Sequence, residues 1–185
     1  MIFIGASLGG VRAIGSILRD LPAAFPRALA VVLHRSKDSD GALVQLLQYE
    51  SALPVSEPTD KEPILPGRVY IAPPDYHLLV EAGHFCLSVD DPIRYARPSI
   101  DVLFESAADA YGLEAIALVL TGANCDGTYG AARIKQAGGL VIVQDPKTAE
   151  APQMPEAVLA KFHPDYILPL DRMAPLLVEL TEVRP

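Results

Sequence analysis

Met1-Ile2-Phe3-Ile4-Gly5-Ala6-Ser7-Leu8-Gly9-Gly10, the first ten residues, contain the features that decide the fold. The four apolar residues at the start are typical of a buried strand, and Gly5 permits a sharp turn. From Val11 onward apolar residues recur at helical spacing, which predicts an amphipathic helix over 11–18. Ser7 therefore lies where a strand passes into a helix, beside N–H groups that have no intrahelical partner and favour negative charge.

The segment Gly5–Gly10 is compatible with three interpretations. The Ser7 hydroxyl can cap the helix, which is the commonest role of a serine at a helix start. As Gly-x-Ser-x-Gly, the segment matches a nucleophile elbow, whose strained turn exposes the hydroxyl beside backbone donors for an oxyanion. As a degenerate Gly-x-Gly-x-x-Gly, with Ser7 in place of the second glycine, it matches a dinucleotide-binding loop. The segment alone leaves all three open.

Composition narrows the class of protein. The 185 residues are 50% hydrophobic and 21% charged, which suits one domain over residues 1–185 with a sizeable core. A net charge of −8 and a pI near 4.9 disfavour binding to nucleic acid or to an anionic membrane. The sequence contains neither a membrane-spanning run nor a signal-peptide pattern, so we expect no membrane insertion and a cytoplasmic location. Cys86 and Cys125 show no pairing or metal-ligand spacing, so we expect free, buried thiols and no metal site.

The rest of the chain alternates continuous apolar runs with amphipathic segments. Runs without polar alternation are typical of strands covered on both faces of a parallel sheet. We therefore predict a doubly wound, mostly parallel α/β sheet of three layers, similar to a Rossmann fold, with an inserted β-hairpin. The expected strands are 28–33, 68–72, 115–120, 140–143 and 166–168; the hairpin is 76–80 with 84–89; the helices are 39–49, 99–111, 128–136, 154–161 and 171–180, with Ser99 as a cap.

Three residues suited to a hydrolytic triad follow predicted strands, namely Ser7, His34 and Asp126. The carboxyl ends of parallel strands share one edge of the sheet, where ligands bind in open α/β folds. In a triad the histidine takes the serine proton, and the carboxylate holds the other ring nitrogen. Each residue also has a structural alternative. Asp126 can cap the helix after Gly127, and His34 can be a hydrogen-bonded histidine at a strand end.

The residues after the predicted strands only partly distinguish a dinucleotide-binding site from a hydrolase site. A dinucleotide site expects an acidic residue after the second strand, where this chain has His34-Arg35-Ser36. Arg35 would suit a 2′-phosphate, so that interpretation stays open. An α/β-hydrolase has the order serine, acid, histidine, whereas here the order is Ser7, His34, Asp126. The local chemistry favours a hydrolase of another fold.

Six segments, in family order, resemble the catalytic domain of the chemotaxis protein-glutamate methylesterases, the CheB family. The resemblance extends through nearly the whole chain. The segments are 4–10, the strand that ends at His34, 70–77, 97–104, 120–122 with 126–127, and 138–139 through 144–145 to 154–155.

The resemblance implies an enzyme that hydrolyses glutamate γ-methyl esters on the cytoplasmic helices of methylated chemoreceptors, with release of methanol. It implies that certain receptor glutamines are often deamidated as well, and that no metal or organic cofactor is needed. Ser7 would be the nucleophile, His34 the general base and acid, and Asp126 the carboxylate that orients His34.

The resemblance also suggests residues around this triad. The oxyanion would be held by backbone N–H groups near Leu8, Gly9 and Gly10, or in the 122–125 loop that contains Ala123. Arg97 would shape the site by pairing with acidic groups of the receptor helix, or it would cap the sheet edge or form a structural salt bridge. His77 is expected to be structural.

The chain departs from the family pattern at several positions. Leu8 follows the serine where threonine or alanine is common, and Arg35 replaces a residue that is often apolar. The loop before the aspartate commonly reads Gly-Met-Gly-x-Asp-Gly, whereas Ala123, Asn124 and Cys125 occupy its middle here. These differences concern the substrate more than the triad.

The best-known members carry an N-terminal receiver domain that covers the active site until it is phosphorylated. The present sequence starts at the first strand of the catalytic domain, which indicates either a fragment or an enzyme without built-in phosphorylation control. Two other functions stay open from sequence alone, a Rossmann-type nucleotide-binding module and a catalytically silent signalling adaptor.

Overall fold

The computed structural model describes residues 1–36 and 41–183. Its strands are β1 (Ile2–Ala6), β2 (Leu29–Leu33), β3 (Val55–Ser56), β4 (Val69–Ile71), β5 (His77–Glu81), β6 (His84–Ser88), β7 (Ile116–Val119), β8 (Leu140–Gln144) and β9 (Tyr166–Leu168). Its α-helices are α1 (Gly10–Asp20), α2 (Ala42–Glu50), α3 (Ile100–Tyr111), α4 (Thr128–Gln136), α5 (Gln153–Lys161) and α6 (Met173–Val183).

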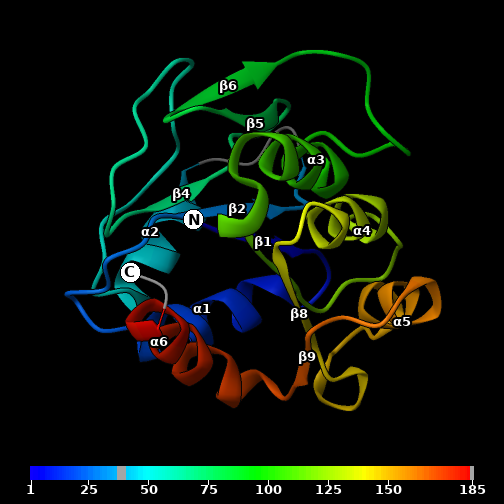
Figure 1. The fold of residues 1–185 in the computed structure, drawn as a ribbon. Helices are drawn as coiled ribbons and strands as arrows, with labels where there is room; N and C mark the ends of the chain where they lie inside the picture. The colour runs from blue at the N-terminus through cyan, green and yellow to red at the C-terminus, as the bar shows by residue number, and fades with distance from the viewer. Residues whose placement is uncertain (37–40, 184–185) are drawn as a thin grey trace.

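The main sheet is parallel and has the order β3-β4-β2-β1-β7-β8-β9 within the described residues (Figure 1). In β1, at its centre, Ile2 lies opposite Leu29 of β2 and Ile116 of β7. The chain winds from β1 to β2 on one side and later continues through β7 on the other. The carboxyl ends of β1 and β7 therefore flank the point where ligands bind in doubly wound sheets. The fold class predicted from the sequence is confirmed.

Helices cover both faces of this sheet. In Figure 1, α1 and α6 lie below it and α3 and α4 above it. Ile2 and Ile4 of β1 pack in the core shared with α1, α2 and α6, whereas Phe3 packs in the core shared with α3, α4 and α5. Every residue of β1 is buried, which accounts for its continuous apolar sequence.

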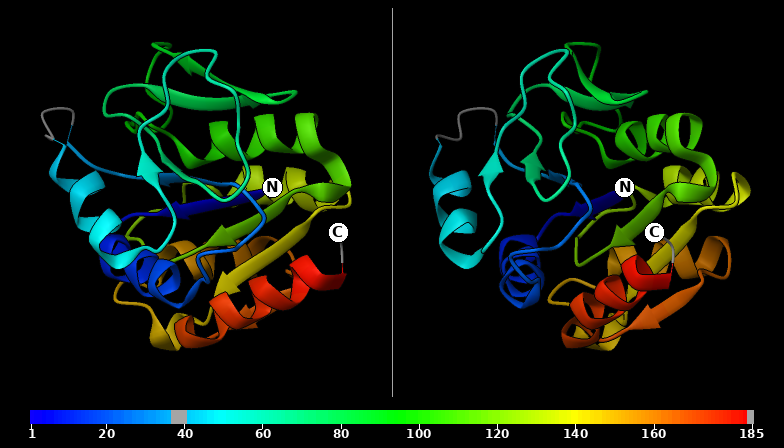
Figure 2. Two further views of the ribbon diagram at one scale, coloured as in Figure 1. Left: turned by 90° about the vertical axis from the view of Figure 1, so that its left-hand side faces the viewer. Right: turned by 60° about the vertical axis from the view of Figure 1, so that its left-hand side comes forward.

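The antiparallel pair β5–β6 forms the predicted hairpin, in which Glu81 lies opposite His84. Figure 2 shows that the hairpin and the loops leading into it form the top of the molecule, beyond α3. Leu78 and Phe85 join the core on the α3 side, where the Phe85 ring lies 4.6 Å from that of Tyr70. The hairpin is thus an extension of that core.

Several local predictions differ from the structure. The expected start of a helix at Ser39 lies outside the described residues, and α2 begins at Ala42. Cys86 and Cys125 are free as expected, but Cys86 is half-buried on the hairpin and Cys125 is exposed on a loop, so the prediction of buried thiols is wrong.

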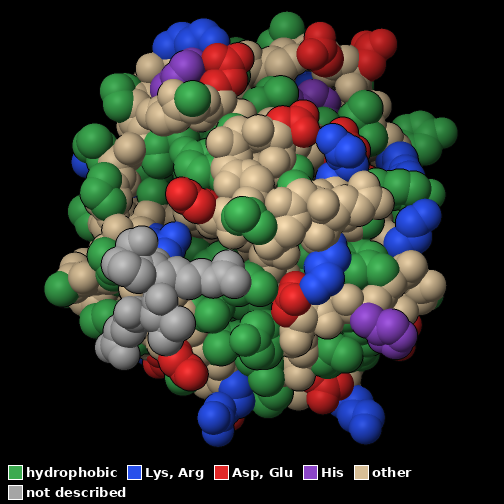
Figure 3. All heavy atoms as spheres, in the orientation of Figure 1, with side chains coloured by type: hydrophobic (Ala, Val, Ile, Leu, Met, Phe, Trp, Pro, Cys, Tyr) green, Lys and Arg blue, Asp and Glu red, His purple; other side chains and the backbone are tan. Residues whose placement is uncertain are grey.

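Among the described residues, no helix combines the length and the apolar character needed to cross a membrane. Acidic and basic side chains are interspersed over the face drawn in Figure 3.

Candidate active site

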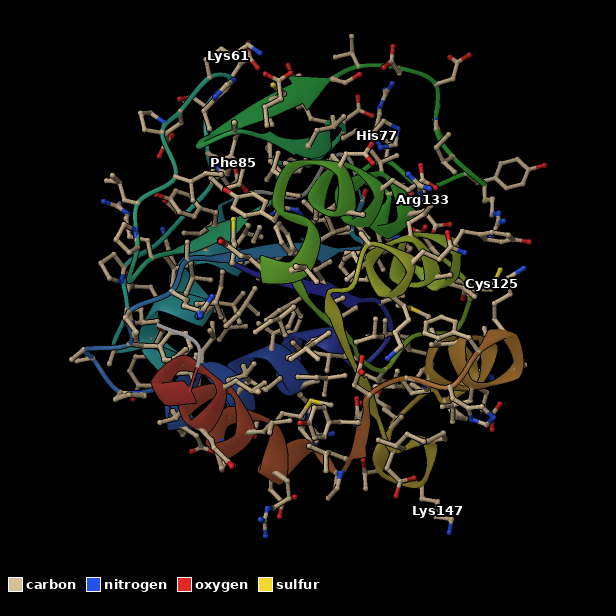
Figure 4. The ribbon with its side chains drawn as sticks, in the orientation of Figure 1. Lys61, His77, Phe85, Cys125, Arg133 and Lys147 are labelled. Atoms are coloured by element: carbon tan, nitrogen blue, oxygen red, sulfur yellow. The ribbon has the colours of Figure 1, made fainter. Side chains whose placement is uncertain are left out.

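Backbone hydrogen bonds continue past the ends of β1, β2 and β7. His34 N–H donates to the carbonyl of Ala6 (3.1 Å), and Ser7 N–H donates to the carbonyl of Thr121 (3.0 Å). Ser7 is thereby linked to the loop after β7, while His34 is tied to the residue just before Ser7. In Figure 4, Cys125 marks this edge, at the right, on the loop before α4. The structure brings the residues together at the edge predicted from the sequence.

His34 and Asp126 form a direct pair, with Nε2 of His34 2.8 Å from Oδ2 of Asp126. Burial would raise the pKa of Asp126, but hydrogen bonds from His34 and from the N–H groups of Ile100 and Asp101 outweigh it. The pKa of Asp126 is therefore held below its usual value. An ionised carboxylate can only accept, so Nε2 carries the proton and Nδ1 has the free lone pair.

The carboxylate of Asp126 caps α3 and not the helix that follows it. It accepts the N–H groups of Ile100 (2.7 Å) and Asp101 (3.0 Å), and the hydroxyl of Ser99 donates to it (2.9 Å). Helix α4 has Gly127 at its N-cap without a side-chain bond, so the alternative of Asp126 as an α4 cap is wrong. Ser99 is the N-cap residue of α3, as predicted, but its side chain makes no capping bond, because its hydroxyl donates to Asp126 instead. The α3 N-terminus adds favourable potential for the charge on Asp126.

Asn124 lies between the other two members of the constellation. Its Nδ2 is 3.0 Å from Nδ1 of His34 and 3.4 Å from Oγ of Ser7. Its Oδ1 accepts the N–H of Asp126 (2.9 Å), which fixes the amide with its NH₂ group toward the site. In the part of the chain that the structure describes, no direct hydrogen bond joins Ser7 to His34, and Asn124 connects them.

The turn after Ser7 is shaped by glycine. Helix α1 has Gly9 at its N-cap and no side-chain cap, so the interpretation of Ser7 as a cap is wrong. The left-handed φ of +79° is at Gly9, whereas Ser7 has no positive φ, so the serine itself is not strained as in a nucleophile elbow. Gly10 N–H donates to the carbonyl of Ser7 (2.8 Å), so the expectation that Gly10 serves as an oxyanion donor is wrong.

The N–H of Gly9, unlike that of Gly10, is directed toward the outside of the turn. The hydroxyl of Thr121 donates to the carbonyl of Leu8 (2.9 Å), and because a trans peptide points its N–H opposite its carbonyl, the N–H of Gly9 faces away from Thr121. Thr121 is itself fixed by the buried Gln144, which accepts its N–H (2.9 Å). Leu8 is 56% exposed and Ala123 is also exposed, so both side chains lie on the outer side of the site.

A pocket of about 420 Å³ opens beside His34. Ser7 is not among its lining residues, and Asn124 is the lining residue that contacts Ser7. The wall of the pocket comes from the loop between β6 and α3, which reaches over the same edge in Figure 1. The pocket is lined by His34, Arg35, Asp75, Pro92, Arg94, Tyr95, Ala96, Arg97, Pro98, Asn124, Cys125 and Asp126.

Arg97 anchors that loop. Its guanidinium donates twice to Asp75 (3.0 and 2.7 Å) and also to the carbonyls of Val89 (2.8 Å) and Asp90 (3.0 Å). Of the three roles expected from the sequence, the structural salt bridge is the one observed. His77, labelled in Figure 4, is equally structural, because its ring accepts the N–H of Ser99 (3.2 Å) and bonds the carbonyl of Asp91 (3.2 Å).

A group of side chains that could together ligate a metal ion lies on the β5–β6 hairpin. Ligand atoms of Glu81, His84 and Cys86 lie within 4.8 Å of one another on the hairpin, the one such group in residues 1–36 and 41–183. The ammonium of Lys61 lies 2.9 Å from Cys86 Sγ and 3.5 Å from Glu81, so a cation already occupies that position.

Comparison with known proteins identifies the family of the chain. The profile of the family described as CheB methylesterase matches residues 2–177. A Leptospira interrogans protein, provisionally named protein-glutamate methylesterase/protein-glutamine glutaminase, is 42% identical over 182 residues, which are 98% of this chain and 94% of that protein. The chain belongs to the CheB methylesterase family.

Other CheB relatives are longer. The Thermotoga maritima protein-glutamate methylesterase/protein-glutamine glutaminase is 38% identical over 184 residues, and the chain spans 54% of its length. The crystal structure of the Thermotoga maritima CheB methylesterase catalytic domain superposes with a TM-score of 0.93, at 38% identity, over 97% of each chain. These matches favour the methylesterase interpretation over the dinucleotide one.

Sequence reasoning did not assign a role to two residues of this CheB site. Asn124 stood out only as a departure from a family glycine, and its contacts with Ser7 and His34 depend on how the loop folds. Asp101 showed no signal, because its neighbours Tyr129 and Gly130 come from another helix.

Proposed function

We propose that residues 1–185 act as one catalytic domain that hydrolyses glutamate γ-methyl esters on methylated chemoreceptor helices in the cytoplasm. Deamidation of receptor glutamines by the same site is part of the proposal. The family supports the reaction class, and the names of the relatives cited above supply both activities for those proteins.

One observation carries the assignment of roles. His34 presents Nε2 to the ionised Asp126 at 2.8 Å and the lone pair of Nδ1 to Asn124, whose amide also contacts Ser7 Oγ. In our proposal Ser7 Oγ attacks the ester carbonyl while its proton passes to Nδ1 of His34. Asp126 stabilises the imidazolium that forms. The N–H groups of Leu8 and Gly9 hold the oxyanion.

The remaining steps return the site to its starting state. The tetrahedral intermediate collapses, the carbon–oxygen bond to methanol breaks, and His34 gives its proton to the leaving methoxide. Water then attacks the acyl-Ser7 with His34 as base, which releases the glutamate carboxylate and restores the serine hydroxyl. A glutamine would follow the same path with ammonia as the leaving group.

The test is methanol release from a methylated chemoreceptor cytoplasmic fragment. We expect Ser7→Ala and His34→Ala each to lower the rate on the order of 10⁴-fold or more, with the double variant close to either single one. His84→Ala, on the hairpin, is the matched control and should keep the wild-type rate. Losses in the two variants that multiply would contradict a nucleophile and base acting as a unit. A folded wild type that releases no methanol would favour the silent adaptor.

A further inference from the structure

Asn124 is held by three hydrogen bonds that leave its amide only one orientation. Oδ1 accepts the N–H of Asp126 (2.9 Å), and Nδ2 faces both His34 Nδ1 (3.0 Å) and Ser7 Oγ (3.4 Å). The side chain lines the pocket beside His34, and the residue is exposed. An NH₂ group with two hydrogens therefore lies against both the proposed base and the proposed nucleophile.

In the resting site this amide occupies the lone pair of the base. Nε2 of His34 carries the proton shared with Asp126, so Nδ1 can only accept, and Asn124 is the donor that it faces. The second N–H of Asn124 is directed to Ser7 Oγ over a longer distance.

Proton transfer from Ser7 changes what Nδ1 can do. Once Nδ1 has received the serine proton it becomes a donor, and it no longer accepts from Asn124. At that moment the carbonyl oxygen of the substrate, on the carbon that Ser7 Oγ attacks, becomes an oxyanion. Donors in oxyanion holes lie about 3 Å from this oxygen, and Asn124 Nδ2 is 3.4 Å from the attacking atom.

We propose that Asn124 is a catalytic residue of this chain: its side-chain N–H rests on His34 Nδ1 and moves to the oxyanion when Nδ1 is protonated. The inference rests on the proposed function, since it needs Ser7 as the nucleophile. Such a donor binds the transition state better than the ground state, which is the condition for raising kcat. It also supplements the backbone donors, of which Gly10 N–H is already bonded to the Ser7 carbonyl.

The test uses a small fluorophosphonate, whose P=O group takes the place of the oxyanion. Ser7 Oγ bonds to phosphorus, the phosphorus–fluorine bond breaks, fluoride leaves and the serine proton passes to His34. The rate is followed by intact mass, with peptide mapping to Ser7. Asn124→Asp keeps Oδ1 and the size of the side chain, whereas Asn124→Gly restores the residue common in the family. Gln136→Glu, on the exposed end of α4, is the control for the same change from amide to carboxylate.

We expect the rate constant for phosphonylation to fall about 10²–10³-fold in both Asn124 variants, with melting temperatures close to wild type and with Gln136→Glu unchanged. With a methyl ester, kcat should fall by a similar factor while KM changes little. Variants that react as fast as wild type, or faster, would overturn the inference and leave Ser7 as the nucleophile. A wild type that is not phosphonylated would overturn both the inference and the role of Ser7.

Discussion

The carboxylates of Asp126 and Asp101 cap each other's helix. Asp126, just before α4, accepts the N–H groups of Ile100 (2.7 Å) and Asp101 (3.0 Å) at the start of α3. Asp101, in the first turn of α3, accepts the N–H groups of Tyr129 (3.0 Å) and Gly130 (2.8 Å) at the start of α4. Each carboxylate thus satisfies donors that its neighbour's helix cannot satisfy itself.

This exchange requires the two helices to be very close. A Cβ atom at Gly130 would lie 2.5 Å from Cβ of Phe104 and 2.8 Å from the carbonyl of Asp101, so only glycine fits there. The position of Asp126 relative to His34 is consequently fixed by the packing of α3 on α4. Stability and catalysis therefore share the carboxylate of Asp126.

Asp126→Asn should reduce both activity and stability. An amide cannot stabilise the His34 imidazolium, and its NH₂ end would face a donor of the α3 N-terminus. We expect kcat to fall on the order of 10⁴-fold and the free energy of unfolding to fall by about 1–3 kcal/mol at pH 7. Because the pKa of Asp126 is lowered in the folded state, its stabilisation is complete at neutral pH and is lost as the pH falls through that pKa. Urea denaturation should show a smaller difference in the free energy of unfolding between wild type and Asp126→Asn at pH 3 than at pH 7. An equal difference at both pH values would contradict the lowered pKa of Asp126.

Asp101→Asn should change the pH dependence of stability in the opposite sense. Burial raises the pKa of Asp101 from 3.8 to about 6, helped by the nearby charge of Asp126. Between these values the unfolded chain has released the proton and the folded protein keeps it, so stability falls as the pH rises through this window. Both N–H groups bond to Oδ1, which asparagine retains.

The Asp101→Asn variant should therefore not lose stability as the pH rises from 4 to 7. Over this range its free energy of unfolding should increase relative to wild type by on the order of 1–2 kcal/mol. Urea denaturation at several pH values measures it. Asp109→Asn, at an exposed position of α3 paired with Arg133, is the control and should follow wild type. Parallel curves for wild type and Asp101→Asn would refute the assignment.

The fold was predictable because the central strands of the main sheet are continuous apolar runs. β1, β2 and β7 are buried on both faces, and such runs, alternating with amphipathic helices, permit few arrangements other than a doubly wound sheet. The parallel register then places Ser7 and His34 at one edge without further information. The hairpin was visible for a similar reason, since a short glycine turn separates two apolar strands.

The partners of Asp126 and Arg97 were not predictable in the same way. Asp126 precedes a helix and has the local pattern of a cap for that helix, but tertiary packing presents it with the N-terminus of α3 instead. Arg97 lies at the end of an irregular loop whose path depends on Asp75, which is distant in sequence. Neither contact follows from periodicity, because both depend on how loops meet across the sheet edge.

Two glycines of the first β–α unit should respond oppositely to alanine. At Gly9, with φ +79°, a Cβ atom would lie 2.8 Å from Cβ of Glu150, so Gly9→Ala adds both strain and a clash. At Gly15, inside α1, the nearest atoms would be 3.5 Å away, an ordinary contact. We expect Gly9→Ala to destabilise by about 1–2 kcal/mol or more, and Gly15→Ala to stabilise by about 0.5–1 kcal/mol. Thermal denaturation compares the melting temperatures of the two variants, and equal shifts from wild type would argue against the left-handed turn at Gly9.

Arg97 should act on receptor binding through the loop that it anchors. Removing the guanidinium breaks its bonds to Asp75 and to the carbonyls of Val89 and Asp90, so the pocket wall loses its fixed position. We expect Arg97→Ala to raise KM for the methylated receptor fragment about 10-fold or more while phosphonylation of Ser7 stays within a few-fold of wild type. Arg97→Lys should resemble the alanine variant, because an ammonium cannot reproduce the planar fork that serves three acceptors. If Arg97 instead paired directly with acidic groups of the receptor, the lysine variant would keep most of the affinity. The increase in KM of the alanine variant would then disappear at high salt.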